Sequence, residues 1–410
     1  MEQADWREQM LLKDRVLAAC EEGITITDPS LPDNPLIYVN QGFERLTGYT
    51  AEEVLGRNCR FLQGPQTDPE AAEEIRRSVR EHRPCTVEIL NYRKDGSPFW
   101  NRLSITPVRD SSGRVTHYIG IQSDVTARRQ AEEALREASR QLEAANVRMK
   151  RDLEAAARIQ RALLPSPDLR LPGISAAWAF QPSTELAGDL FNLFPLGEDH
   201  AGFYVLDVSG HGVPAALVSM AVTRLLNPAP GRSVLFQADP NRPGQYRLAS
   251  PSSAILRLNE FFPFDPRTAQ YFTLVYCLLN CSSGELRYTA AGHIPPILVP
   301  KSGDVRLLEP GGPPVGLLTS PEIAEHTVHL APGDRIYLCT DGILEAENPA
   351  GQEFGMERLL ARFGAACRQT LEDSVQFMLA GVKDWGGGSG LIDDATILAV
   401  EREQPTAGRI

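Results

Sequence analysis

The feature that most constrains this chain is a long segment without helix breakers, residues 126–164, with the sequence TARRQAEEALREASRQLEAANVRMKRDLEAAARIQRALL. It contains no Gly and no Pro, and most of its residues are strong helix formers. Apolar and small residues recur there at alternating steps of three and four, at Ala131, Leu135, Ala138, Leu142, Ala145 and Met149. This is the spacing of a coiled-coil seam. The segment therefore predicts one continuous helix.

The seam changes phase near its C-terminal end. After Met149 the next seam position would be Asp152, but the apolar stripe resumes at Leu153. Two consecutive steps of four form a stutter, which locally unwinds a supercoil. A narrow apolar stripe on so long a helix is not buried by the helix itself, so we expect a parallel homodimer through residues 126–164 that joins two globular domains. The alternative is a lone solvated linker helix.

Length and composition limit the functions open to the chain. Its 410 residues predict two or three domains, and its net charge of -12 gives no basic surface for nucleic acid or an anionic membrane. Neither a signal peptide nor a membrane-spanning apolar run is present in the sequence. The seven Cys are scattered without a C-x-x-C pair, which fits free thiols in a reducing cytoplasm. We expect a cytoplasmic protein without nucleic-acid or membrane partners.

Hydrophobic periodicity divides the chain. Residues 1–22 predict an amphipathic helix, residues 23–125 a first domain, residues 126–164 the linker helix, residues 165–402 a second domain, and residues 403–410 a tail. In the first domain two short strands (GITITD, LIYVN) precede short helices (QGFERLTG, YTAEEVLG). Three longer strands follow, CTVEILNYR, PFWNRLSITPVR and THYIGIQSDV. This order predicts a five-stranded antiparallel sheet with helices on one face and a pocket between them.

The helical part of the first domain contains the octapeptide GRNCRFLQ, residues 56–63. On physical grounds alone, Cys59 between Asn58 and Arg60 is either a reactive thiol or a packed free cysteine. The octapeptide resembles the signature of LOV domains, the flavin-binding blue-light branch of the PAS superfamily. The resemblance implies bound FMN and covalent addition of Cys59 to the flavin after photon absorption.

The resemblance extends to other flavin contacts. It implies that the FMN site consists of Asn58, Cys59, Arg60, Leu62, Gln63, Arg76, Asn91, Asn101 and Gln122. Arg60 and Arg76 would hold the phosphate, and Asn91, Asn101 and Gln63 would face the polar edge of the flavin ring. Gln122 would reorient its amide when the adduct forms, and it lies just before the linker helix. Thr25 lies close to the ring in the family pattern and would tune the lifetime of the adduct.

The second domain alternates short strands with helical segments, which predicts an α+β β-sandwich with helices outside. The stretch 227–250 is rich in Pro and Gly without periodicity, and we expect a mobile insertion there. Several carboxylates stand out, at Asp189, Asp207, Asp341, Asp393 and Asp394. Asp207 and Asp341 each end an apolar strand and are followed shortly by Gly. Oxygen ligands without a His/Cys cluster favour Mg²⁺ or Mn²⁺ over zinc.

The order of these motifs, with AAGHIPP at 290–296, resembles the metal-dependent PPM serine/threonine protein phosphatases, and in particular their bacterial SpoIIE branch. RIQRALLP at 158–165 resembles the helix that leads into that domain. The resemblance implies an αββα sandwich with two Mn²⁺ or Mg²⁺ ions, held by Asp189, Asp207, the Val208 carbonyl, Asp341, Asp393 and, with less support, Asp394. Asp207, Asp341 and Asp393 would carry the catalytic metals. His211 and His293 would have minor or structural roles.

Together these features predict a blue-light-regulated protein phosphatase. Its substrate would be a phosphoprotein, by resemblance a phosphorylated STAS-type anti-sigma-factor antagonist. The alternative is a light-sensing scaffold whose phosphatase-like domain binds a partner without turnover. A sensor histidine kinase is disfavoured because residues 126–164 contain no His. A redox sensor that works through flavin reduction, independent of Cys59, is the remaining alternative.

Overall fold

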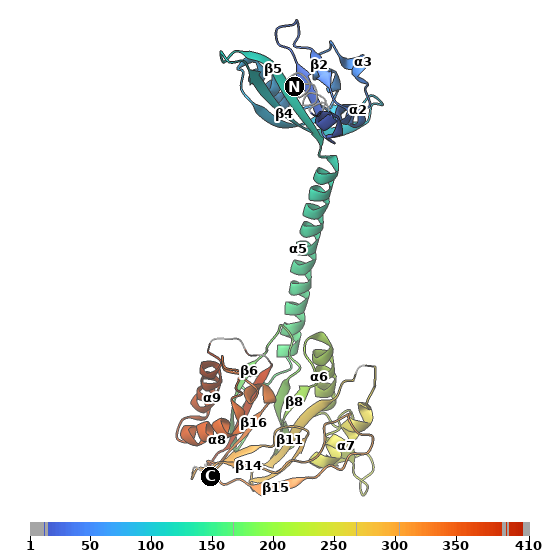
Figure 1. The fold of residues 1–410 in the computed structure, drawn as a ribbon. Helices are drawn as coiled ribbons and strands as arrows, with labels where there is room; N and C mark the ends of the chain where they lie inside the picture. Colours follow the sequence, from blue (N-terminus) through green and yellow to red (C-terminus); the bar gives the residue numbers. More distant parts are fainter. Residues whose placement is uncertain are drawn as a thin grey trace. The chain divides into compact units, whose positions relative to one another are not determined.

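The computed structural model describes residues 12, 15–166, 168–267, 269–302, 304–387, 391 and 393–404 (Figure 1). The chain divides into two compact units, residues 1–146 and 147–410, which are described separately. The predicted N-terminal helix lies only partly within the described residues, of which 12 and 15–19 are helical. Of the predicted tail, residues 405–410 lie outside them. No helix in the described parts of the chain is long and apolar enough to cross a membrane.

The first unit is built on one antiparallel sheet of five strands in the order β2-β1-β5-β4-β3. The strands are β1 (Gly23–Thr27), β2 (Leu36–Val39), β3 (Cys85–Tyr92), β4 (Pro98–Arg109) and β5 (Val115–Asp124). The predicted five-stranded antiparallel sheet is thereby confirmed. Between β2 and β3 the chain forms α2 (Gln41–Thr47), α3 (Ala51–Val54), the 3-10 helix η1 (Cys59–Leu62) and α4 (Pro69–Arg80).

Local sequence explains where these helices begin and end. The Asn40 side chain accepts a hydrogen bond from Phe43 N at 2.9 Å and so caps α2, which stops at Gly48 with a φ of 76°. Asp68 caps α4 in the same way, with Pro69 in the first turn. Helix α4 was not among the predicted elements, although Ala72, Ile75 and Val79 recur in it at helical spacing; half of its residues are charged.

The linker helix is observed as α5, Thr126–Arg161. It ends three residues before the predicted limit, and residues 162–164 form turns. The seam residues Leu135, Leu142 and Met149 are exposed, Leu135 by 72%. After the stutter the stripe becomes partly buried: Leu153, Ala156 and Ala157 pack against Leu186 and Ala216, all within the second unit. The stripe is therefore exposed before the stutter and packed against the same chain after it.

The second unit contains two antiparallel five-stranded sheets that pack face to face. One has the order β15-β12-β11-β8-β7 and the other β14-β13-β16-β17-β6. The first comprises β7 (Leu190–Leu196), β8 (His200–Val208), β11 (Phe272–Asn280), β12 (Glu285–Ala291) and β15 (His326–His329). The second comprises β6 (Ile174–Gln181), β13 (Ile297–Val299), β14 (Arg306–Leu307), β16 (Arg335–Cys339) and β17 (Ala395–Arg402).

Helices cover both outer faces of this sandwich. In Figure 1, α6 (Val213–Leu225) and α7 (Pro251–Phe261) lie on the side of β8 and β11, and α8 (Gly355–Ala366) and α9 (Leu371–Trp385) lie on the side of β6 and β16. Strand β8 shows why: Phe203 and Val205 join the core between the sheets, whereas Tyr204 and Leu206 join the core under α6 and α7. The predicted αββα sandwich is confirmed.

The stretch 227–250, for which a mobile insertion was predicted, contains the strand pair β9 (Phe236–Ala238) and β10 (Tyr246–Leu248), which was not predicted. Three-residue strands are too short to give a readable alternation in sequence. The short strands β13, β14 and β15 were not predicted for the same reason.

Candidate functional site

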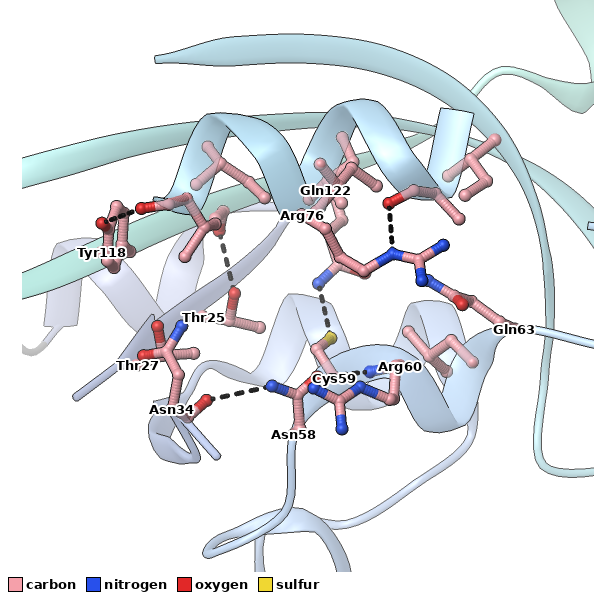
Figure 2. A pocket seen from close by; sticks show the side chains of 18 of the residues that line it. Thr25, Thr27, Asn34, Asn58, Cys59, Arg60, Gln63, Arg76, Tyr118 and Gln122 are labelled. Carbon is pink, nitrogen blue, oxygen red and sulfur yellow. Dashed lines mark hydrogen bonds between the residues drawn. The ribbon is translucent and has the colours of Figure 1, made fainter. Parts of the chain in front are cut away.

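A cavity of about 480 Å³ lies between the sheet and the helices of the first unit (Figure 2). Its wall includes all nine residues predicted to contact flavin, namely Asn58, Cys59, Arg60, Leu62, Gln63, Arg76, Asn91, Asn101 and Gln122. Thr25 also lines it and donates a hydrogen bond to Gly120 O at 3.3 Å. Residues from η1, α4 and four strands therefore meet around one space.

Three amide side chains form the polar wall of this cavity. Asn101 Nδ2 donates to Asn91 Oδ1 at 2.8 Å and to Gln122 Oε1 at 3.2 Å. All three side chains are buried, and Asn101 Oδ1 has no hydrogen-bond partner among the described residues. A buried unpaired carbonyl oxygen is costly unless a ligand donates to it. The polar edge of a flavin ring, which carries both N–H and C=O groups, fits this wall.

Cys59 faces the same wall. It is the first residue of η1, which Asn58 caps by accepting from Arg60 N at 3.1 Å. Gln122 Nε2 points at Cys59 Sγ across 3.7 Å (Figure 2). Burial raises the pKa of the Cys59 thiol to about 11. The sulfur is therefore a protonated thiol that lies within the cavity and beside the amide wall.

Two arginines stand at the exposed rim of the cavity. Arg60 forms an ion pair with Asp33 at 2.8 Å, and Arg76 pairs with Glu73 at 3.3 Å. Both side chains are exposed, so they can exchange these partners for a phosphate group. The opposite end is closed by Tyr118, whose hydroxyl lies 2.7 Å from Val79 O and 2.6 Å from His82 Nδ1. This donor set fits FMN, which supplies light absorption and an electrophilic ring when it is bound.

The second candidate site lies where both sheets of the second unit end together. Asp189 precedes β7, Asp207 lies at the end of β8, Asp341 follows β16, and Asp393 and Asp394 precede β17. Thr340 Oγ1 and Thr396 Oγ1 both donate to Asp189 Oδ2, at 2.8 and 2.6 Å. These bonds cross from one sheet to the other and hold the carboxylates at one end of the sandwich.

The carboxylates lie close enough to interact. Burial, and then the charge of Asp207, raise the pKa of Asp189 well above its usual range. Burial, and then the charges of Asp341 and Asp393, raise the pKa of Asp207 to about 7. Burial raises the pKa of Asp393 as well. Such a concentration of negative charge is stabilised by a divalent cation.

The carboxylates are not packed as a closed metal cage. No three His, Cys, Asp or Glu side chains of the described residues gather closely enough to hold one ion between them. Mg²⁺ and similar hard cations keep several waters and take only one or two carboxylates each. The chemistry of the carboxylate donors thus suits a hard divalent cation, although the structure does not bring three of them, among the described residues, around one point.

Asp394 differs from the other acids. Its Oδ1 accepts from Ser183 N at 2.7 Å, and its Oδ2 accepts from Gly188 N at 2.7 Å. Both of its oxygens are thus engaged in holding the loop before Asp189. Gly342 packs against it so closely that an added Cβ would lie 2.1 Å from Asp394 O. The glycine after Asp341 is explained by this backbone approach.

The structure also shows residues near this site that the sequence analysis missed. The charges of Asp341 and Asp393 contribute, after burial, to a raised pKa of Glu345, so this carboxyl lies near the cluster. Gln160, at the end of α5, is buried and forms a two-way bond with the Ala187 backbone, donating to Ala187 O at 2.7 Å and accepting from Ala187 N at 3.1 Å. Thr340 and Thr396 adjoin predicted acids, and Gln160 lies in the RIQRALLP segment at 158–165, but its bond to Ala187 was not predicted. Nothing in the sequence marks Glu345.

The two histidines of the motifs occupy different surroundings. The charge of His211 contributes to the pKa of Asp393, so His211 lies beside the acidic cluster. His293 is buried, with Nδ1 2.9 Å from Ile294 O and Nε2 without a partner among the described residues. Burial lowers the pKa of His293 to about 4. His293 is therefore a neutral, packed side chain.

Comparison with known proteins defines the class. The family model for stage II sporulation protein E (SpoIIE) matches residues 197–403, and a PAS domain model matches residues 21–127. The chain belongs to the SpoIIE family. It is a LOV-type PAS domain fused to a SpoIIE-type domain of the PP2C fold.

Similar proteins support each half. A blue-light-activated histidine kinase of Brucella anthropi is 52% identical over 101 residues, which cover 25% of this chain and 21% of that protein. Phototropin-2 of Oryza sativa subsp. japonica is 48% identical over 108 residues, 26% of this chain and 12% of that protein. The matches thus span about a fifth or less of these relatives' lengths. The SiaA-PP2C domain of Pseudomonas aeruginosa shares the fold, with a TM-score of 0.53 and 22% identity over 63% of this chain and 98% of that structure.

Proposed function

We propose that this protein is a blue-light-regulated, metal-dependent protein-serine/threonine phosphatase. The observation that carries the proposal is the joint sheet end where Asp189, Asp207, Asp341 and Asp393 share one electrostatic environment. Two divalent ions at such a site supply a metal-activated water and neutralise charge on a phosphate ester. The substrate class is a phosphoserine or phosphothreonine protein, by resemblance a STAS-type anti-sigma-factor antagonist.

The acids have distinct proposed roles. Asp207 would serve both ions, and the Val208 carbonyl would assist one of them. Asp341 and Asp393 would hold the second ion, while Asp189 would complete the set directly or through water. Because both oxygens of Asp394 accept backbone hydrogen bonds, we assign it mainly to positioning the Ser183–Asp189 loop.

The light signal begins at Cys59 in this proposal. FMN bound in this cavity would supply blue-light absorption and an electrophilic ring, and Cys59 would supply the thiol that adds to it. Gln122 would turn its amide to keep a hydrogen bond to the edge of the ring. Gln122 lies two residues before Asp124, which accepts a hydrogen bond from Thr126 N at 2.9 Å at the start of α5. The change at the amide can therefore bias the helix.

Helix α5 is the proposed transmitter. Light biases it between two packings around the stutter, and the 158–164 segment moves against the phosphatase core. Gln160 gives this movement a direct route, since it holds the backbone of Ala187, two residues from Asp189. A coupling of about 1–3 kcal/mol is enough for a several-fold to hundred-fold response.

The first test is hydrolysis of p-nitrophenyl phosphate by the full chain reconstituted with FMN and Mn²⁺, in darkness and under blue light. We expect metal-dependent hydrolysis whose rate changes with light, and loss of the light response in Cys59→Ala. Metal-dependent hydrolysis that is equal in both conditions would refute light gating of catalysis. A light response that survives in Cys59→Ala would favour the redox-sensor alternative.

The variant Asp207→Asn distinguishes the phosphatase from the scaffold alternative. A phosphatase loses hydrolysis in this variant, whereas a scaffold shows no hydrolysis even in the wild type and changes only in partner binding. Glu322→Gln, an exposed position outside the acidic cluster, is the matched control and should keep full activity.

A further inference from the structure

A second hollow lies in the phosphatase unit, away from the acidic cluster. It has a volume of about 350 Å³ and is formed by the C-terminal end of α6, the β9–β10 hairpin and α7. Leu225, Val234, Phe236 and Phe261 make its apolar wall, and Arg232 and Tyr246 stand beside them. We call this hollow the hairpin groove.

The hairpin groove is held in shape by the chain around it. Arg257 Nη1 donates to Phe236 O at 2.6 Å and to Val234 O at 3.2 Å. Ala249 N donates to Leu235 O at 2.8 Å, and Leu235 is buried. The Tyr246 side chain approaches the backbone at Gly231 closely, because an added Cβ at Gly231 would lie 2.9 Å from the Tyr246 hydroxyl. The groove is therefore a preformed surface.

Apolar side chains continue outward from the groove. Phe261 is 58% exposed, and Phe264, Leu317 and Leu318 are also exposed. Asn259 joins the two segments that carry them, donating to Leu318 O at 2.9 Å and accepting from Gly316 N at 2.8 Å. Clustered exposed apolar side chains of this kind mark protein interaction surfaces.

The segment that forms the hairpin groove has an excess of positive charge, whereas the whole chain is negative. Residues 224–265 contain five Arg (224, 232, 242, 247, 257) and three acids (239, 260, 265), although the full chain has a net charge of -12. The described residues that line the groove include Arg232 and Arg257 and no acid, and Arg224 is exposed on the neighbouring end of α6. The lining thus favours a negatively charged ligand.

We propose that the hairpin groove docks an acidic segment of the phosphoprotein substrate. This inference rests on the proposed phosphatase function and assigns a second recognition site to it. Helix α6 spans the two sites: it begins at Val213, six residues after Asp207, and ends at Leu225 in the groove. Its 13 residues correspond to about 20 Å. An extended chain covers that distance in roughly six residues.

The physical reason for two sites is electrostatic. The catalytic end is crowded with carboxylates, which repel an acidic protein until metal ions neutralise them. A positive, partly apolar groove one helix length away attracts the same protein and raises the local concentration of its phosphoryl group at the metals.

The test uses two phosphoserine peptides and the full FMN- and Mn²⁺-loaded chain. In one peptide a run of six Glu lies eight residues from the phosphoserine, and in the other six Gln replace the Glu. We expect kcat/KM to be about tenfold higher for the Glu peptide, and the gain to shrink as ionic strength rises. The gain should vanish in Arg224→Glu/Arg232→Glu. Arg306→Glu, an exposed change on β14 of the other sheet, should keep it.

Hydrolysis of p-nitrophenyl phosphate is the common readout for folding and catalysis, and it should be equal in all three proteins. If it is absent in the wild type, the proposed phosphatase function fails. If it is normal but the Glu and Gln peptides are hydrolysed equally, docking at the groove is overturned. Binding of a single-stranded RNA to the wild type that Arg224→Glu/Arg232→Glu abolishes would also overturn the assignment to an acidic protein.

Discussion

At the residue scale, Gln160 shows how one side chain can connect a helix to a metal site. Its amide replaces both hydrogen bonds that the Ala187 backbone would otherwise make with water or another strand. Because the pair is buried, removal of the amide leaves a backbone N–H and a C=O without partners.

We therefore expect Gln160→Ala to lower the free energy of unfolding by about 1–3 kcal/mol. It should also weaken Mn²⁺ binding and reduce the ratio of activity between light and darkness. Thermal unfolding and isothermal titration with Mn²⁺ measure the two effects. Glu154→Ala, an exposed change on the same helix, is the control. Unchanged Mn²⁺ affinity in Gln160→Ala would show that this bond only supports the fold.

His293 illustrates a buried group that titrates in acid. Its Nδ1 lies against a carbonyl oxygen and must donate, so the neutral ring leaves Nε2 unprotonated and unpaired. Burial lowers the pKa to about 4 from 6.5, so the folded state resists protonation that the unfolded state accepts. The stability that depends on the neutral ring is complete above pH 6.5 and is lost as the pH falls towards 4.

A shift of this size corresponds to about 3 kcal/mol across that window. We expect the free energy of unfolding of the phosphatase unit to fall by that order between pH 7 and pH 4, and His293→Asn to flatten the profile. Denaturant titrations at a series of pH values measure it, with the exposed His329→Asn as the reference. The same slope in both variants would assign the acid sensitivity to other groups.

At the element scale, the apolar stripe of α5 changes its surroundings along the helix. Up to Met149 its seam residues are exposed, and beyond the stutter Leu153, Ala156 and Ala157 pack on Leu186 and Ala216. The stutter predicted from sequence coincides with this change of partner. A continuous heptad repeat would direct both halves of the stripe to the same side.

Deletion of one residue, Arg151, rotates the seam by about 100° relative to the packed end of the helix. We expect both sites to remain functional, with normal adduct formation and metal-dependent hydrolysis, while light regulation is lost. Deletion of the seven residues 138–144 keeps the heptad phase and should preserve regulation. Light regulation that persists after the single deletion would eliminate α5 as the transmitter.

At the scale of the whole molecule, the seam of α5 is exposed, and we propose that a second copy of the chain covers it. Leu135 and Leu142 are 72% and 62% exposed, which is unusual for large apolar side chains at a regular spacing. A second copy of the same helix is the occupant that the heptad pattern specifies.

We expect the full chain to be a dimer in light scattering, and Leu135→Glu/Leu142→Glu to halve the measured mass. Ala144→Glu/Val147→Glu, at exposed positions on the face opposite the seam, should remain dimeric. A wild-type chain that scatters as a monomer in both light and darkness would contradict the coiled-coil proposal.

Much of the fold was predictable because it depends on local periodicity. Strands such as β3, β4 and β5 are recognised in the sequence by alternating apolar and polar residues between turn residues. Helix α5 is recognised by the absence of Gly and Pro. The strands β9, β10 and β13 to β15 were not predicted, because a two- to four-residue strand leaves no readable period. Their structure is set by the elements they pack on. Helix α4 was overlooked, although Ala72, Ile75 and Val79 recur in it at helical spacing.

The sequence by itself determined the chemistry: a Cys in GRNCRFLQ, amides on successive strands, and carboxylates at strand ends. Only the tertiary structure decided which groups meet, including Gln122 beside Cys59, Thr340 and Thr396 on Asp189, and Gln160 on Ala187. A side chain's own type fixes what it can donate or accept. Its partner, often tens or hundreds of residues away, is fixed by how the sheets and helices pack, and local periodicity carries no record of that.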